Sequence, residues 1–217
     1  MRVFISSTAK DLFAYRQAAE RVVQQIGWQP VLLMEHHSVP GGPIVQSCRQ
    51  LVWQCDVFVL IVGHRCGWVP SLAQGGNGVD SMTAIEFATW IERVRQRGGF
   101  QPIIMFATGH RSHDDPSEDA DSAAFQVVFR RRVRGLHIVH DFEYDEAAAI
   151  PQTAYFSSML RTQLAHYKTW LADEEVRRLQ AEKERQRNDK WAIGALALGL
   201  GIWLGGSGGE DGEHDDE

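Results

Sequence analysis

Two runs of β-forming residues, each followed at once by small polar residues, constrain the fold of this chain most. The first is Val3–Ile5, which stops at Ser6, and the second is Asp56–Val62, which stops at Gly63. Runs that are apolar on both faces are typical of strands buried in a parallel sheet. We therefore expect both runs to be central strands of one sheet.

Segments with helical spacing of apolar residues alternate with the strand-like runs. Strands that alternate with helices in this way predict an α/β fold, a doubly wound parallel sheet of about five strands. We expect the strand order 2-1-3-4-5, which places the ends of the first and third strands side by side. The expected helices cover Leu12–Ile26, Pro43–Val52, Thr83–Arg97 and Asp121–Arg134, and the other expected strands are Gln29–Met34, Gln101–Ala107 and Leu136–His140.

Polar residues gather where the first strand ends. Ser6, Ser7, Thr8 and Asp11 follow the apolar run directly. In open α/β sheets, ligands bind outside the carboxyl ends of the strands, near the point where strand order reverses. These four residues are therefore candidates for ligand binding. The alternative is that Ser7, Thr8 or Asp11 only caps the helix that follows.

Composition narrows the class of protein. The formal net charge of -6 argues against a general nucleic-acid binder, which is normally basic, so we expect no nucleic-acid partner. The three cysteines, Cys48, Cys55 and Cys66, lack CxxC spacing. They indicate buried thiols in a reducing compartment, and not zinc ligands or disulfides.

The sequence lacks the motifs of two further kinds of site. The sequence has no G-x-x-x-x-G-K-[ST] stretch, so the chain is not a P-loop nucleoside triphosphatase. The histidine pairs His110/His113 and His137/His140 lack a third ligand nearby in the sequence, and we expect no metal site.

The pattern changes after the α/β part, which we place at residues 1–150. Residues 151–190 predict a helical stalk, amphipathic at first and highly charged over Asp173–Lys190. An apolar helix follows at 191–206, and residues 207–217 form an acidic tail that we expect to be disordered.

The uncharged run Trp191–Leu204 suggests a membrane anchor. Lys and Arg residues precede it and none follows it, and tryptophans lie near both of its ends. We expect one helix that anchors a cytoplasmic domain to the inner cell membrane, with the C-terminus outside. The run spans only about 21 Å of a hydrocarbon core about 30 Å thick. Burial in an oligomer or against the domain is therefore the alternative.

Three separated motifs resemble one known family. VFISSTAKD near the start, DVFVLIVGHRCGWVP in the middle and SMTAIEF after it are similar, in the same order, to motifs of the DUF4062 domain. That family typically shows FISST…DL, a strand ending G-x-R-Y-G, and T-x-x-E-[YF]. Cys66 departs from the usual tyrosine, and the likeness covers about Arg2–Gln101. Because DUF4062 domains are similar to TIR domains, the resemblance implies a flavodoxin- and TIR-like sheet.

The resemblance also implies a function. DUF4062 domains occur chiefly in bacterial and STAND-type signalling proteins with inferred defence roles. Some TIR domains cleave NAD+ at the nicotinamide–ribose bond, using a glutamate on the helix after the third strand, and that position is Glu86 here. The turn Ser6–Asp11 and Arg65 would line the same pocket.

This assignment is chemically reasonable. A carboxylate can stabilise the positive charge that develops on the ribose when the bond breaks. Arg65 could pair with a diphosphate, and Trp68 could stack on a nicotinamide or adenine ring. The plainer interpretation of Glu86 is a capping box with Thr83, and that of Arg65 is an ion pair with a nearby acid.

Taken together, the sequence predicts a TIR-like signalling or defence effector that cleaves NAD+ or a related nucleotide. It would need no cofactor, would self-associate, and would be held at the membrane through Trp191–Leu204. Two alternatives belong to other classes. One is a non-catalytic, self-associating adaptor, and the other is a regulatory domain that binds a nucleotide without cleaving it; either would act through the membrane helix.

Overall fold

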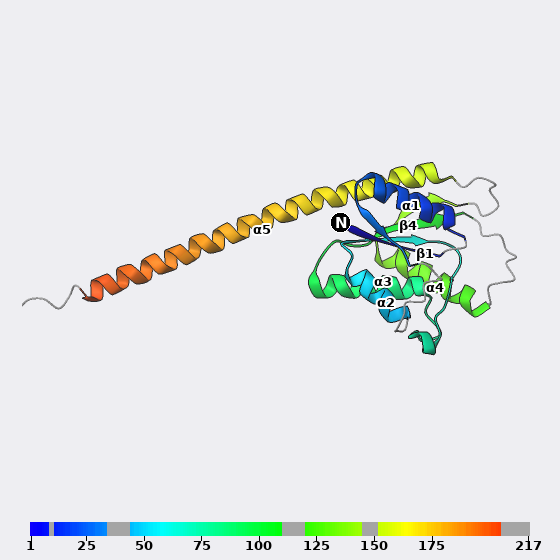
Figure 1. The fold of residues 1–217 in the computed structure, drawn as a ribbon, viewed down its shortest axis with the longest axis horizontal. Helices are drawn as coiled ribbons and strands as arrows, with labels where there is room; N and C mark the ends of the chain where they lie inside the picture. The colour runs from blue at the N-terminus through cyan, green and yellow to red at the C-terminus, as the bar shows by residue number, and fades with distance from the viewer. Residues whose placement is uncertain (9–10, 34–43, 110–119, 145–151, 205–217) are drawn as a thin grey trace, which may run out of the picture. The chain divides into compact units, whose positions relative to one another are not determined.

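The structure is a computed structural model. Of the 217 residues, it describes 1–8, 11–33, 44–109, 120–144 and 152–204. The chain divides into two units, Met1–His166 and the part that begins at Tyr167. Figure 1 shows the elements in chain order.

The first unit is built on a parallel sheet of five strands. The strand order is β2-β1-β3-β4-β5, which confirms both the predicted fold class and the predicted order. All six residues of β3 are buried, as expected for a central strand that is apolar on both faces. The strands are β1 (Arg2–Ser7), β2 (Gln29–Val31), β3 (Val57–Val62), β4 (Ile103–Thr108) and β5 (His140–Glu143).

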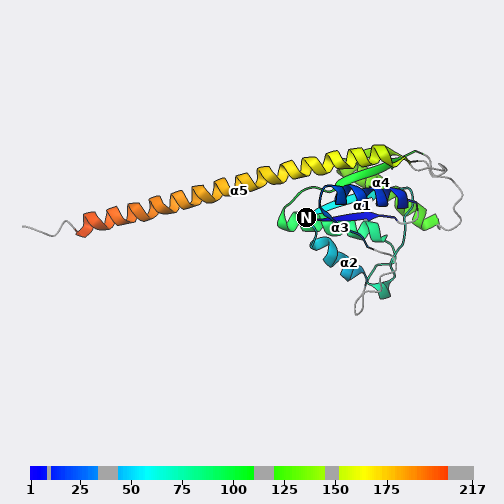
Figure 2. The same cartoon turned by 45° about the horizontal axis from the view of Figure 1, so that its top comes forward.

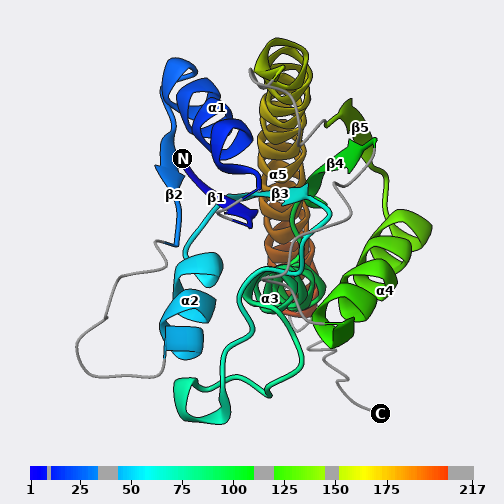
Figure 3. The same ribbon diagram turned by 90° about the vertical axis from the view of Figure 1, so that its right-hand side faces the viewer.

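Helices cover both faces of the sheet (Figure 3). Helix α1 (Phe13–Gln25) and the first turns of α5 (Thr153–Leu204) lie on one face. Helices α2 (Ile44–Trp53), α3 (Met82–Arg97) and α4 (Ala120–Leu136) lie on the other. A short helical turn, η1 (Leu72–Gln74), precedes α3.

Aromatic rings form the centre of both cores. On the face covered by α2 and α3, the rings of Phe4, Phe58 and Trp90 stack in sequence at centroid distances of 5.6 and 5.5 Å. Helices α2 and α3 pack beside each other on this face (Figure 2). On the opposite face, Phe156 of α5 lies 5.3 Å from the ring of Tyr15 and 5.1 Å from that of Phe142. The start of α5 is therefore part of the first unit's core.

The predicted edge strands differ most from the observed ones. We predicted β5 at Leu136–His140, but α4 continues to Leu136 and β5 begins at His140. The reason is that only Phe142 of β5 is buried, so this strand has no apolar run to mark it. At the other edge β2 ends at Val31, and Met34, the last residue predicted for it, lies outside the described residues.

The second unit continues α5. The rings of Tyr167 and Trp170 lie 5.7 Å apart, and Arg177 forms an ion pair of 2.8 Å with Glu174. Side chains from residue 172 to residue 190 are exposed. The boundary between the two units falls at His166, inside a continuous helix and inside the predicted stalk of residues 151–190.

The predicted membrane-spanning helix is not supported. Within the described ranges, no helix combines the length and the apolar character that crossing a bilayer requires. The run Trp191–Leu204 is helical but too short, since 14 residues rise only about 21 Å. Extending the segment backwards along α5 brings in the charged residues Asp189 and Lys190.

The packing of α5 against the sheet can be tested by truncating one side chain. Leu160 is fully buried, so Leu160→Ala should lower the free energy of unfolding by about 2–5 kcal/mol, as buried leucines do. Tyr155, on the same helix, is 65% exposed, and Tyr155→Ala should change the free energy by less than about 0.5 kcal/mol. Urea unfolding measures both. Equal, small effects would show that α5 is not part of the core.

Candidate functional site

The turn after β1 meets the loop after β3 at the carboxyl edge of the sheet. Ser7 at the end of β1 is in register with Ile61 of β3, so the two strands end side by side. A Cβ on Gly67 would lie 2.8 Å from the methyl carbon of Thr8, and a Cβ on Gly63 would lie 2.6 Å from Asp11 Oδ2. Gly67 also has a φ of +76°, which favours glycine. Both glycines therefore allow the close approach of loop and turn.

A pocket opens at this edge, beside the end of β1. It lies at the C-terminal end of the strand. Residues from both faces of the sheet line it, because successive strand residues point to opposite faces. Ser7 points to the α1 side, and Glu86 comes from α3 on the other side. The polar and aromatic lining consists of Ser7, Thr8, Arg16, Trp68, Thr83 and Glu86.

Glu86 is the buried carboxyl group of this pocket, and only 4% of its surface is exposed. The hydroxyl of Ser6 donates a hydrogen bond of 2.5 Å to Oε2, and the thiol of Cys48 donates one of 3.3 Å to Oε1. Burial raises the pKa of Glu86 to about 7, although both hydrogen bonds and the charge of Arg16 act in the opposite direction. Near neutral pH, Glu86 therefore exists in both its protonated and its ionised form.

Glu86 does not cap its helix. Ser81, and not Thr83, is the N-cap of α3, and its hydroxyl accepts a hydrogen bond of 3.3 Å from the backbone N–H of Ala84. Helix α3 thus begins before the predicted Thr83, and Glu86 lies beyond the position from which a capping box is formed. The capping interpretation was wrong because the side chain turns into the protein interior, toward Ser6 and Cys48.

The residues after β1 do not cap α1 either. The N-cap of α1 is Leu12, which makes no side-chain capping bond. The hydroxyl of Thr8 donates instead to Asp11 Oδ1 within the turn. The hydroxyl of Ser7 is buried and has no hydrogen-bond partner among the residues that the structure describes. Ser7 therefore leaves an unpaired donor and acceptor in the wall of the pocket.

Two of the three charged residues predicted for the site, Asp11 and Arg65, lie together but do not line the pocket. Burial raises the pKa of Asp11, and the charge of Arg65 partly opposes this effect. Ser6 also stays outside the lining and reaches the site through its bond to Glu86. Four of the seven predicted site residues, Ser7, Thr8, Trp68 and Glu86, line the pocket directly. Their roles in binding or catalysis stay predictions.

Arg16 is a pocket residue that the sequence analysis missed. Its guanidinium donates a hydrogen bond to the backbone carbonyl of Leu33, and its charge favours the ionised form of Glu86. A signal was present, because Arg16 occupies a position of helical spacing between Leu12 and Ala19, both of which are buried. A charged residue on the apolar stripe of a helix indicates a partner or a site.

Cys48 is the second residue missed. It lies on α2, and the sequence analysis treated it as an ordinary buried thiol. No motif connects Cys48 to Glu86, 38 residues later, so only the packing of α2 against α3 reveals the contact.

Helix α4 fixes the other half of this sheet edge. Arg130 donates hydrogen bonds of 2.7 Å to the carbonyls of Gly63 and Ala107, and Gln126 donates one of 2.8 Å to Gly63. Burial lowers the pKa of Arg130 to about 10, which still leaves the group charged at neutral pH. These donors hold the loop after β3 in the place where it meets the turn after β1.

The chain matches, over residues 2–152, the family described as "Domain of unknown function (DUF4062)". The chain belongs to the DUF4062 family. The DUF4062 domain includes the whole sheet and every residue of the pocket, and extends well beyond Gln101, where the likeness of the motifs ends. A comparison with curated proteins gives no match.

Three solved structures are similar to this DUF4062 domain at low identity. The TIR domain heterodimer of RPS4 and RRS1 is 14% identical at a TM-score of 0.40, over 76% of this chain and 94% of that one. The CMP N-glycosidase BcmB of Clostridium botulinum is 16% identical at 0.32, over 67% and 91%. The diflavin flavoprotein A3 of Nostoc sp. is 13% identical at 0.39, over 81% and 95%.

The raised pKa of Glu86 predicts how the free energy of unfolding depends on pH. Folding lifts this pKa from 4.5 to about 7, so the native state keeps a proton that the unfolded state loses between these values. The stabilisation of wild type relative to Glu86→Gln is therefore full below pH 4.5 and falls as the pH rises to about 7. Each pH unit in this window is worth up to about 1.4 kcal/mol. Urea unfolding at several pH values measures the difference; parallel pH profiles for the two proteins would contradict the burial described.

Two glycine variants test the contact between the loop and the turn. Gly67 and Gly78 both have positive φ, of +76° and +72°, but a Cβ on Gly78 would meet no atom within 4 Å. Gly78→Ala should cost about 1–2 kcal/mol for the backbone conformation alone. Gly67→Ala should cost about 1–3 kcal/mol more, because its Cβ overlaps Thr8. Thermal unfolding measures both losses of stability. Equal losses in the two variants would show that contact with Thr8 does not require glycine at position 67.

Proposed function

We propose that the DUF4062 domain is a signalling or defence effector that cleaves the N-glycosidic bond of NAD+ or a related nucleotide, with Glu86 as its catalytic residue. The observation that carries this proposal is the placement of Glu86. Its carboxyl is buried in the wall of a pocket at the carboxyl edge of the sheet and takes no part in capping α3. A buried carboxyl is costly to maintain, and a raised pKa in a pocket is typical of functional sites.

The chemistry required of Glu86 is simple. When the bond between ribose and base breaks, the base leaves with the electron pair, and positive charge develops on the ribose. The ionised carboxylate stabilises that charge in a site of low dielectric. Water then adds to the anomeric carbon and loses a proton to the solvent. Because only the ionised form of Glu86 serves this step, the rate should rise as the pH passes through about 7.

The other pocket residues suit a nucleotide. Arg16 supplies a guanidinium, which pairs well with phosphate oxygens. The unpaired hydroxyl of Ser7 can bond to a ribose hydroxyl or a phosphate. Trp68 is partly buried and offers an aromatic face for a base. The proposal needs no cofactor, because every group used belongs to the chain itself.

A second candidate is a regulatory domain that binds the nucleotide without cleaving it. The observation in its favour is the same raised pKa, which leaves a large share of Glu86 protonated at neutral pH. A protonated carboxyl donates a hydrogen bond and does not stabilise a cation.

Self-association is part of the proposal in either case. The second unit supports it, because Val176 and Leu179 are exposed apolar side chains within the highly charged stretch Asp173–Lys190 of α5. They are three residues apart and therefore lie on one face of the helix. In the adaptor alternative, this contact between copies would be the whole function.

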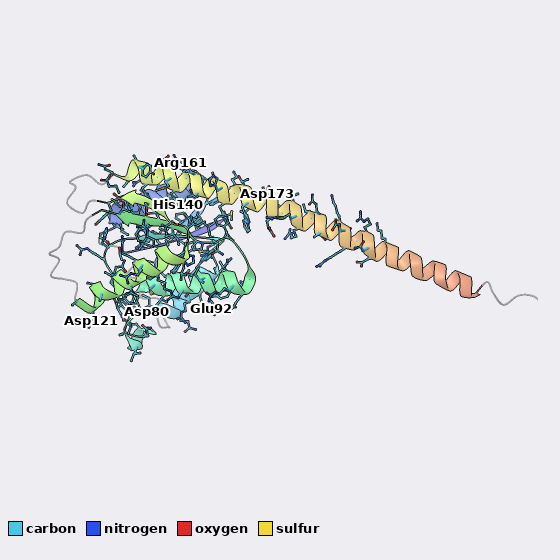
Figure 4. All side chains as sticks on the ribbon, turned by 180° about the vertical axis from the view of Figure 1, so that it is seen from behind. Asp80, Glu92, Asp121, His140, Arg161 and Asp173 are labelled. Carbon is cyan, nitrogen blue, oxygen red and sulfur yellow. The ribbon has the colours of Figure 1, made fainter. Side chains whose placement is uncertain are left out.

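The catalytic role of Glu86 is tested by release of the base. Full-length protein, dilute and concentrated, is incubated with NAD+ and with nucleoside monophosphates, and free base is measured by chromatography. Wild type should release base, and Glu86→Gln should reduce the rate by at least about 100-fold, since it removes the charge and keeps the shape. The control is Glu92→Gln, an exposed residue on the same helix (Figure 4), which should match wild type.

Each contrary outcome of this experiment has a distinct meaning. A Glu86→Gln protein that releases base at the wild-type rate would refute the catalytic role. Binding of a nucleotide, measured by calorimetry, without release by wild type would favour the regulatory domain. Neither binding nor release at any protein concentration would leave the adaptor.

A further inference from the structure

Both oxygens of the Glu86 carboxyl are held from inside the protein. Ser6 donates to Oε2 from the end of β1, and Cys48 donates to Oε1 from α2. Cys48 is fully buried, so its thiol approaches the carboxyl from the core and not from the pocket. Three elements that are distant in the sequence thus converge on one carboxyl group.

Cys48 is suited to be a constant donor. Burial and the charge of Glu86 both raise the pKa of its thiol far above the usual range, so the thiol keeps its proton whenever Glu86 is ionised. A thiolate here would repel the carboxylate, whereas the S–H group donates to it. The buried position also shields the sulfur from oxidants in solution, which argues against a redox role for Cys48.

We infer that Cys48 is a positioning residue for Glu86, whose S–H group acts with the Ser6 hydroxyl to hold the carboxyl plane toward the pocket. The inference rests on the proposed function for what the positioned carboxyl does, but the contact itself belongs to the fold. A carboxyl on a flexible glutamate side chain would otherwise sample several orientations. With one donor on each oxygen, from two different elements, rotation of the group costs a hydrogen bond.

Among the described residues, Ser6, Cys48 and Arg16 are the groups that act on the pKa of Glu86, so the effect of Cys48 can be isolated. From β1 the facing group is Ser6, and from α1 it is Arg16, whose charge also favours ionised Glu86. Strand β3, packed beside β1, carries only apolar residues. Arg49, on α2, acts on the thiol and slightly opposes the rise of its pKa.

Removal of the thiol should therefore shift the titration of Glu86. In Cys48→Ala, Oε1 loses its donor, the ionised form is less stable, and Glu86 should titrate about half to one pH unit higher. In Cys48→Ser, a hydroxyl restores a stronger donor, and the midpoint should return to the wild-type value or below it. The matched control is Cys55→Ala, since Cys55 is an equally buried free thiol for which the structure shows no bond to Glu86.

The experiment uses full-length protein labelled with ¹³C at the glutamate carboxyl carbons. The signal of Glu86 is identified by its absence in Glu86→Gln, and its chemical shift is followed against pH in each cysteine variant. A higher midpoint in Cys48→Ala, restored by serine and absent in Cys55→Ala, supports the inference. Identical midpoints in Cys48→Ala and Cys55→Ala would overturn it. If Cys48→Ala does not fold, Cys48→Val takes its place, because valine also removes the donor and fills most of the buried space of the thiol. A Glu86 midpoint in Cys48→Val equal to that of wild type would overturn the inference.

Measurement of base release on the same variants separates this inference from the proposed function. If wild type cleaves NAD+, the pH profile of kcat should move with the Glu86 midpoint in Cys48→Ala, while KM stays constant. Cleavage by wild type with no shift in the titration refutes the role of Cys48 and leaves the function standing. A shifted titration with no cleavage by any variant refutes the function and leaves the contact between Cys48 and Glu86 established.

Discussion

The burial of one carboxyl group shapes the sheet edge at which β1 and β3 end. Glu86 is surrounded by protein at the end of β1, and an unsatisfied carboxyl there would be very costly. Ser6 and Cys48 reduce the cost by donating one hydrogen bond to each oxygen. This explains why β1, which is apolar from Val3 to Ile5, then carries a buried serine, Ser6, on the same side as Phe4.

The central part of the fold could be predicted because hydrophobic burial leaves a clear mark on the sequence. The run that forms β3 is apolar on both faces, and this placed it at the centre of the sheet. Edge strands leave a weaker mark. Strand β5 buries only Phe142, so the sequence of its four residues resembles that of a loop. The predicted strand was placed too early because it included the apolar Ile138, which is 83% exposed in the structure. Burial at an edge depends on neighbours that a local pattern does not contain.

The candidate site was predictable in its location but not in its contacts. The carboxyl ends of β1 and β3 follow from strand order, and Ser7, Thr8 and Trp68 were found in this way. The motif around Glu86 suggested a local hydrogen bond to its own helix, whereas the observed partners lie 80 and 38 residues away. Packing between elements decides whether Glu86 bonds to its own helix or to Ser6 and Cys48. A capping motif contains no information about that packing.

The arginine on α4 has a consequence for how a ligand approaches. Arg130 occupies the carbonyls of Gly63 and Ala107, which follow β3 and lie within β4, and its guanidinium stacks over the ring of Phe106. In that half of the sheet edge, these two carbonyls are therefore paired with the protein's own cation. The half at β1 holds the unpaired hydroxyl of Ser7. A ligand that binds at this edge would therefore find a buried, unpaired hydroxyl in the wall of the pocket beside β1, whereas Arg130 already pairs the two backbone carbonyls at the β3 and β4 half.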